Sequence, residues 1–342
     1  MVKAIASLLM VFLSVTPDTF CGTPSGPRFT RFEFTEIRMG TRFAIILYAP
    51  DIMTATRAAN AAFKRVEELD AIMSDYRATS ELMKLCLKSG GQWARVSNDL
   101  FRVLAASQEM ARRTGGAFDV TVGPLVRLWR RARRKGEMPT PQSLAGAIEL
   151  TGYGKLKLDG KTRSVRFDKP GMLLDLGGIA KGYAADEAMV ALKRNGIRRA
   201  LVAAGGDIVV SRPPPGSRGW LIGIASLEPS GEAPKDSVLL YDAAISTSGE
   251  KEQHVEIGGV RYSHIVDPRT GFAVTGRSSV TVIAATGTIS DSIATAVNVL
   301  GPQRGLELIN STARASGIII QADAEGARTF KSKLWGRVSK RR

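Results

Sequence analysis

One segment combines an apolar run, two adjacent glycines and a helical pattern in direct succession. Residues 172–176 predict a buried strand, Gly177-Gly178 a tight turn, and the apolar spacing after Ile179 a helix that Asn195-Gly196 ends. This order fixes a sharp reversal of the chain next to a helix N-terminus, so the neighbouring elements must be arranged around it.

The turn ahead of this helix has the chemistry of an anion site. Backbone N–H groups at a glycine turn and a helix N-terminus attract phosphate. Lys181 adds a positive charge one turn into the helix, and Asp175 adds a carboxylate just before the glycines. The segment indicates a phosphate site, with or without a metal, although an ordinary strand-to-helix connection with a solvated lysine fits the same residues.

The positive charge of the chain is concentrated in two places. The 342 residues are 44% apolar and 23% charged, as in globular proteins, and the net charge is +16. Residues 127–135 and 331–342 each hold six bases and no acid, which leaves 36 bases against 32 acids elsewhere. This distribution favours an exposed helix face and a basic tail over nucleic-acid binding, so we expect no nucleic-acid partner. An acidic lipid or protein partner stays open.

The N-terminus resembles an export signal. Lys3 precedes an apolar stretch at residues 4–15, which suits a signal peptide and is short for a membrane span. Cys21 stands where a bacterial lipoprotein carries its lipidated cysteine, but Asp18-Thr19-Phe20 differ from the small residues that precede such a cysteine. We expect export to the periplasmic side of the cytoplasmic membrane without a lipid anchor at Cys21. With Cys86 as the other cysteine, there is no disulfide framework.

Strands and helices are mixed along the chain without strict alternation. Residues 28–48 alternate like strands around a bulge or turn at Met39-Gly40-Thr41, residues 54–72 have helical spacing, and a helix capped by Ser97 or Asn98 ends at Gly115-Gly116. The pattern predicts an α+β fold.

Asp291 and Thr295 are the strongest pair of candidate metal ligands. They lie four residues apart at a predicted helix start with Ser290 as cap, so both face one side of the helix. A carboxylate and a hydroxyl so placed suit Mg²⁺ with water, backbone carbonyls and phosphate. A helix whose Asp favours the N-terminal dipole and whose Thr bonds to the preceding turn is the alternative.

His264 follows a predicted strand three residues before Asp267. A histidine there suits general-base chemistry, and a hydrogen-bonded histidine at a strand end fits equally. Tyr76 and Phe118 are each able to stack on an aromatic ring, although core packing is the usual role of such residues.

Eight ordered motifs together resemble the ApbE family of FAD:protein FMN transferases over about residues 32–320. They are Met39-Gly40-Thr41, Met73-Ser74-Asp75-Tyr76, residues 116–126 (GAFDVTVGPLV), 175–182 (DLGGIAKG), Gly205-Gly206-Asp207-Ile208, Ser246-Thr247-Ser248-Gly249, 263–271 (SHIVDPRTG) and 291–296 (DSIATA).

The resemblance implies a two-lobed α+β fold with FAD in the cleft between the lobes, in one catalytic domain at residues 28–330. Residues 1–27 are then a signal region and loop, and residues 331–342 a basic tail. It also implies a Mg²⁺-dependent enzyme that joins FMN from FAD to a Thr or Ser hydroxyl of an acceptor protein, a membrane or periplasmic redox protein, and releases AMP.

Site residues follow from the matching motifs. FAD is expected on Met39, Tyr76, Ala117, Phe118, Asp119, Asp175, Lys181, His264 and Ile265. Mg²⁺ is expected on the side chains of Asp291 and Thr295, with backbone oxygens around Gly178 and Thr288. His264 and Asp291 are the candidate catalytic residues. Gly178 stands where the family often has Ala, which is harmless if only its carbonyl is used.

Two other functions use the same residues. A hydrolase that splits FAD to FMN and AMP needs the same metal site with water as nucleophile, and a non-catalytic flavin-binding protein needs only the FAD contacts.

Overall fold

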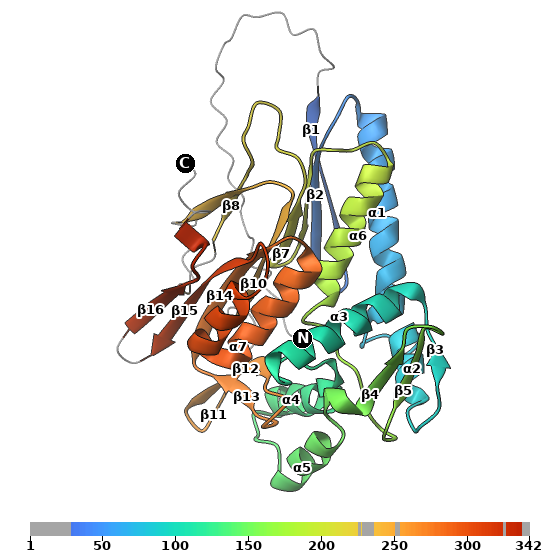
Figure 1. Ribbon diagram of the computed structural model, residues 1–342, viewed down its shortest axis with the longest axis vertical. Coiled ribbons are helices and arrows are strands. Elements are labelled where there is room, and N and C mark those ends of the chain that lie inside the picture. Colours follow the sequence, from blue (N-terminus) through green and yellow to red (C-terminus); the bar gives the residue numbers. More distant parts are fainter. Residues whose placement is uncertain (1–28, 225–226, 228–235, 250–253, 324–325, 337–342) are drawn as a thin grey trace, which may run out of the picture.

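A central sheet of eight strands organises the computed structural model, which describes residues 29–224, 227, 236–249, 254–323 and 326–336 (Figure 1). Its strand order is β1-β2-β6-β7-β10-β14-β15-β16, and every neighbouring pair is antiparallel. These strands are β1 (Thr30–Arg38), β2 (Thr41–Ala49), β6 (Ala200–Ala204), β7 (Asp207–Val210), β10 (Ala243–Gly249), β14 (Arg277–Ala284), β15 (Ser316–Asp323) and β16 (Gly326–Lys331).

Three small antiparallel sheets flank the central one. They are formed by β3 (Ala94–Arg95), β5 (Ser164–Phe167) and β4 (Leu156–Asp159); by β8 (Trp220–Gly223) and β9 (Ser237–Leu240); and by β11 (His254–Ile257), β12 (Val260–Val266) and β13 (Ala273–Thr275). The helices are α1 (Ile52–Met73), α2 (Glu81–Leu87), α3 (Asn98–Thr114), α4 (Gly123–Lys135), α5 (Pro141–Glu149), α6 (Ala180–Arg194) and α7 (Gly287–Asn310), with 3₁₀ turns η1 (Val120–Val122) and η2 (Tyr153–Lys155). The predicted α+β class is confirmed.

Local sequence signals place several element ends correctly. The Ser97 hydroxyl accepts a hydrogen bond from the Leu100 N–H and caps α3, and Gly115 ends that helix in the left-handed conformation. The turn between β1 and β2 lies at Met39 and Gly40, both with positive φ.

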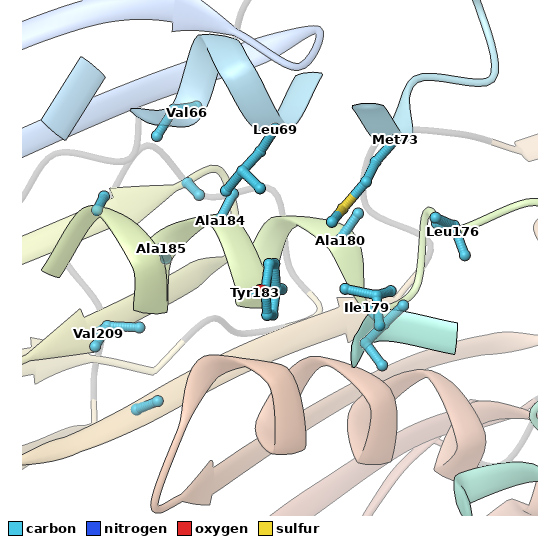
Figure 2. Packing of buried hydrophobic residues seen from close by; sticks show 14 of the residues in the cluster. Val66, Leu69, Met73, Leu176, Ile179, Ala180, Tyr183, Ala184, Ala185 and Val209 are labelled. Atoms are coloured by element: carbon cyan, nitrogen blue, oxygen red, sulfur yellow. The ribbon is translucent and has the colours of Figure 1, made fainter. Parts of the chain in front are cut away.

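Two apolar clusters cover opposite faces of the central sheet. On β2, Ile45 and Leu47 belong to the main cluster, whereas Ile46 between them belongs to the second, because successive side chains on a strand alternate between faces. The main cluster is covered by α1, α6 and α7. Figure 2 shows Leu69 and Met73 of α1 packed over Ala180 and its neighbours on α6. A third cluster joins α4 and α5 to β12 and β13.

The predicted strand at residues 172–176 is wrong. Met172, Leu174 and Leu176 are buried as expected, but the segment has no place in any sheet. Its backbone is satisfied elsewhere, since the Asp175 N–H donates to the Val120 carbonyl at 2.8 Å and the Leu174 N–H donates to the Cys86 Sγ at 3.4 Å. The apolar pattern of residues 172–176 therefore reflects burial of the segment and not membership of a sheet.

Two other expectations are corrected. Thr286, not Ser290, caps α7, because the Ser290 hydroxyl lies one turn inside the helix and bonds to Ser246. The folded chain also passes the predicted boundary at residue 330, since Lys331 belongs to β16 and Trp335 is buried in the second cluster.

Several expectations fall on residues that the structure does not describe. The signal region at residues 1–27, Cys21 and the last six residues of the basic tail lie outside the described residues. Among the residues that are described, no helix is long and apolar enough to cross a membrane.

Candidate functional site

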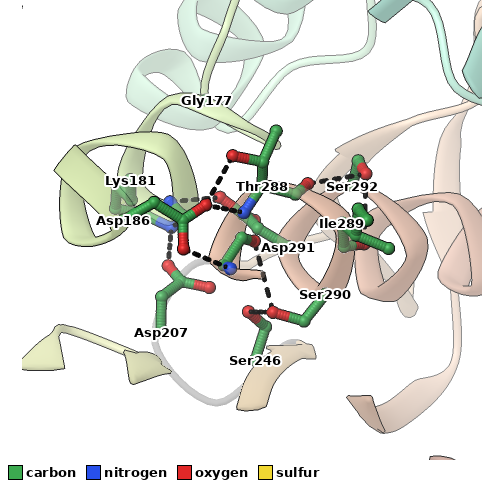
Figure 3. A network of polar contacts seen from close by, with 12 residues as sticks. Gly177, Lys181, Asp186, Asp207, Ser246, Thr288, Ile289, Ser290, Asp291 and Ser292 are labelled. Atoms are coloured by element: carbon green, nitrogen blue, oxygen red, sulfur yellow. Dashed lines mark hydrogen bonds and ion pairs between the residues drawn. The ribbon is translucent and has the colours of Figure 1, made fainter. Parts of the chain in front are cut away.

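Lys181, Asp207 and Asp291 meet where α6, β7 and α7 converge (Figure 3). The Lys181 Nζ lies 2.5 Å from the Asp207 Oδ2 and 3.9 Å from the Asp291 Oδ2. The Asp291 Oδ2 also accepts a hydrogen bond from the Gly182 N–H at 3.0 Å. One N–H group in the first turn of α6 is therefore already used by a protein carboxylate.

Glycines allow the two helices to approach this closely. A Cβ at Gly182 would lie 2.2 Å from the Gly287 carbonyl oxygen and 2.8 Å from the Asp291 Cβ. A Cβ at Gly178 would lie 2.9 Å from the Thr295 Oγ1. Gly178 is thus packed closely against a predicted metal ligand, so an alanine here forces Thr295 or the glycine turn to shift.

Burial and charge shift the protonation of this cluster. Burial, followed by repulsion from Asp207, raises the pKa of Asp291 to about 7. Burial lowers the pKa of Lys181, but attraction to Asp207 and Asp291 outweighs it, so that the pKa of Lys181 is raised. The site therefore holds a permanent cation beside a carboxylate that gains from a further positive charge.

The predicted donors for Mg²⁺ fit a hard cation chemically. Asp291 is only 4% exposed and offers a carboxylate, Thr295 offers a hydroxyl, and Gly178 lies in contact with Thr295. Among the described residues, no group of three or more His, Cys, Asp or Glu side chains is spaced for a metal. A metal here depends on backbone oxygens and substrate to complete its coordination.

Thr288 is held by α6. Its N–H and hydroxyl both donate to the Asp186 Oδ2, at 2.9 and 2.7 Å, and its carbonyl accepts a hydrogen bond from Ser292 at 2.8 Å. The side chain of Thr288 is therefore committed to the helix junction, and its backbone oxygen, the predicted ligand, already accepts the Ser292 hydroxyl.

A second cluster is centred on Arg130 of α4. One edge of its guanidinium contacts Asp75, the other donates to the Asp175 Oδ2 at 3.0 Å, and the group lies 4.5 Å from the centre of the Tyr76 ring. Tyr76 is 79% exposed. Burial, followed by repulsion from Asp75, raises the pKa of Asp175. The expectation that the basic residues of this helix are all solvated is wrong for Arg130.

Ala117, Phe118 and Asp119 lie between α3 and α4. Ala117 and Phe118 are buried, with Phe118 in the main core, so ring stacking on Phe118 is closed off by packing. The Asp119 Oδ1 accepts hydrogen bonds from the Thr121 N–H and hydroxyl at 2.8 and 2.7 Å. The segment reaches the Arg130 cluster through the bond between Val120 and Asp175.

His264 lies in an irregular part of β12. The register between β12 and β13 shifts between Tyr262 and Val266, and such irregularities re-aim side chains. His264 is half-buried and Ile265 is buried. β12 packs against both α4 and α7, so His264 lies on the strand between the helix of Arg130 and the helix of Asp291.

Met39 lies in the turn between β1 and β2, near the turn that precedes Asp207, the partner of Lys181. A Cβ at Gly205 would come within 3.0 Å of the Thr41 Oγ1, and the next turn residue, Gly206, is followed by Asp207. The β1–β2 turn therefore borders the Gly205-Gly206 turn, which leads into β7 at Asp207.

The structure thus joins Gly178, Lys181, Asp291 and Thr295 directly, and it places Tyr76 and Asp175 in a separate cluster with Arg130. The roles of all these residues toward FAD and metal stay predictions. Sequence reasoning gave no role to Asp186, Asp207 or Arg130. For Asp207 the available signal was its position after two glycines, which is similar to the position of Asp175 before two glycines. For Arg130 there was no such signal, because it is one of six basic residues between 127 and 135.

Known proteins resemble this chain over most of its length. A profile described as the ApbE family matches residues 39–319. The FAD:protein FMN transferase of Vibrio cholerae is 32% identical, with 86% of this chain and 88% of that protein covered, and that of Salmonella typhimurium is 31% identical, with 96% and 93% covered.

Solved structures agree with this relationship. The flavin transferase ApbE from Vibrio cholerae superposes with a TM-score of 0.81 at 29% identity, covering 91% of this chain and all of that one. The ApbE protein from Thermotoga maritima gives 0.80 at 28% identity, also over 91% of this chain. The extent of the profile match and the identity to these relatives show that this chain belongs to the ApbE family.

Proposed function

We propose that this protein transfers FMN from FAD to a Thr or Ser hydroxyl of an acceptor protein and releases AMP. Membership of a family whose relatives are FAD:protein FMN transferases supports the reaction. The observation that carries it in this chain is the junction of α6 and α7, where a lysine, a buried carboxylate, a hydroxyl and a glycine meet.

The reaction exchanges the phosphoanhydride bond of FAD for a phosphoester bond to the acceptor. The acceptor oxygen bonds to the FMN phosphorus, the bond from that phosphorus to the bridging oxygen breaks, and AMP leaves with that oxygen. Positioning and charge neutralisation supply most of the catalysis in such transfers. Asp291 and Thr295, with backbone oxygens of Gly178 and Thr288, would hold Mg²⁺, which when bound would supply Lewis-acid stabilisation of the phosphate oxygens.

The chain's own side chains hold the reacting groups. Lys181, fixed by Asp207, presents a positive charge next to the phosphates, and His264 takes the proton of the acceptor hydroxyl. Tyr76 has an exposed ring with a guanidinium against it, which supports a stacking contact with FAD in the cleft between two lobes. We also propose that the protein acts after export, on a membrane or periplasmic redox protein.

An assay with FAD, Mg²⁺ and an acceptor peptide that contains a single threonine tests the function. We expect fluorescent flavin covalently bound to the peptide, together with one AMP per flavin. Free FMN without labelled peptide identifies a hydrolase instead, and unchanged FAD leaves only binding. A peptide with valine in place of threonine is the control, because it keeps the shape and lacks the hydroxyl.

The role of His264 has its own test. His264→Ala is expected to lose most of the transfer rate while FAD binding, measured by flavin fluorescence, stays close to wild type. His254→Ala is the matched control, since His254 is exposed and lies on the neighbouring strand β11. If His264→Ala transfers FMN at the wild-type rate across the pH range, His264 is not the base.

A further inference from the structure

Helix α4 carries an exposed basic face. Arg127, Arg131, Arg134 and Lys135 are exposed, and no acidic residue occurs between Gly123 and Lys135. The first three recur at intervals of four and three residues, so they lie along one side of the helix. We call these four residues the basic face. A surface of one charge over about two helical turns attracts a partner of opposite charge.

The basic face adjoins the candidate site. Arg130, on the same helix, is bound to Asp75, Asp175 and Tyr76, and Arg127 lines a small crevice with Asp75 and Asp175. The helix itself is fixed, because the indole N–H of Trp129 donates to the Gly271 carbonyl at 2.8 Å, on the loop that follows β12. Through Arg127, a partner bound on this face is therefore held close to Asp75 and Asp175.

Arg133 is a half-buried charge with no ion pair in the described part of the chain. Its side chain is half-buried, and its Nη1 is shielded from water without a hydrogen-bond partner among the residues that the structure describes. Burial, followed by repulsion from Arg130, lowers the pKa of Arg133, and both acids near Arg130 are already paired with it. A buried donor without an acceptor is unfavourable, so an incoming carboxylate is favoured here.

We propose that the basic face and Arg133 together form the docking surface for an acidic segment of the acceptor protein. This inference rests on the proposed function and names the chemistry of its partner: carboxylate side chains flanking the hydroxyl that receives FMN. The recessed Arg133 favours a protein over a lipid surface, because a protruding Asp or Glu side chain reaches a half-buried guanidinium that a flat layer of headgroups does not.

Binding of two peptides without FAD tests the surface independently of catalysis. Both contain one threonine, and one has flanking aspartates where the other has asparagines. We expect fluorescence anisotropy to show roughly tenfold tighter binding of the acidic peptide to the full-length protein, the gain expected from charge-assisted hydrogen bonding. The preference should shrink at high salt, because exposed charges are screened.

Variants assign the effect to residues. Arg133→Gln and the double variant Arg131→Gln/Arg134→Gln should each lose most of the preference for the acidic peptide. Arg133→Lys should recover part of it, because the charge is kept and the planar fork is lost. Lys193→Gln/Arg194→Gln removes two basic residues from the last turn of α6 and should keep the full preference.

Three results overturn the proposal. One is equal binding of both peptides by the wild type. Another is a loss in Lys193→Gln/Arg194→Gln as large as that in Arg131→Gln/Arg134→Gln. The third is binding of the wild type to vesicles of anionic phospholipid that the α4 variants lose while their peptide binding is unchanged, which assigns the face to a membrane. If the protein binds the acidic peptide selectively but transfers no flavin, the docking surface is supported and the proposed function is rejected.

Discussion

Asp186 of α6 accepts two hydrogen bonds from Thr288 of α7, one from its backbone N–H at 2.9 Å and one from its hydroxyl at 2.7 Å. Its other oxygen accepts the Gly287 N–H at 2.7 Å. A carboxylate on one helix thus satisfies the first N–H groups of another, which fixes the start of α7. Asp291 and Thr295 follow one and two turns later, so this contact sets where they face.

Removal of Asp186 should therefore affect both stability and metal binding. We expect Asp186→Ala to lower the free energy of unfolding by about 1–2 kcal/mol, as loss of a helix cap does, and to raise the Mg²⁺ concentration for half-maximal transfer. Urea unfolding in EDTA and Mg²⁺ titration measure the two effects. Asp51→Ala removes the cap of α1, where Asp51 accepts the Thr54 N–H at 2.7 Å, and should change stability alone. An unchanged Mg²⁺ requirement in Asp186→Ala contradicts this role.

The helix crossing should tolerate no side chain at Gly182. A Cβ there would meet the Gly287 carbonyl at 2.2 Å, so Gly182→Ala should force α6 and α7 apart and lower the free energy of unfolding by about 3 kcal/mol. Gly146→Ala is the control: that site on α5 has no atom within 4 Å of an added Cβ, and alanine should stabilise the helix by about 0.5–1 kcal/mol. Thermal unfolding by circular dichroism compares the two variants with the wild type. A melting temperature of Gly182→Ala equal to that of the wild type would contradict the close crossing of α6 and α7.

Asp291 should make the metal-free protein more stable at mildly acidic pH. Burial raises its pKa from 3.8 to about 7, so the folded state holds a proton that the unfolded state releases. The resulting stabilisation is complete below pH 3.8 and is lost as pH rises through 7. Urea unfolding in EDTA at pH 5 and pH 8 measures it. Asp291→Asn should reduce this difference, and it should abolish transfer at ordinary Mg²⁺ concentrations; full activity in this variant rejects the metal assignment.

Arg130 should position the side chains of Tyr76 and Asp175, which are predicted to contact FAD. Arg130→Met removes the partner of Asp75 and Asp175 and the cation against Tyr76. We expect the KM for FAD to rise about tenfold, with a smaller change in kcat, because charge-assisted bonds contribute about 1.5–3 kcal/mol. Arg130→Lys should recover only part of this loss, since lysine lacks the fork. Arg198→Met, on an exposed loop, is the control. A fall in kcat with no change in KM contradicts a positioning role.

Short-range features were predictable because their causes lie within a few residues. The cap at Ser97, the left-handed Gly115 and the turn at Met39-Gly40 each depend on local backbone geometry. The α+β class followed from the mixture of periodicities, and the eight ordered motifs were sufficient for the family. The strand expected at residues 172–176 failed because an apolar run records burial, and burial does not require a sheet.

The sequence by itself determined which chemical groups are available: a glycine turn with Lys181, a helix with Asp291 and Thr295, and a basic helix at residues 123–135. Only the tertiary structure decided how they are used. Asp291 bonds to Gly182, and Asp186 bonds to Thr288, each across more than a hundred residues. Arg130 was separated from its solvated neighbours in the same way, by Asp75 and Asp175. Such pairings depend on how helices pack across the sheet, which local periodicity does not encode.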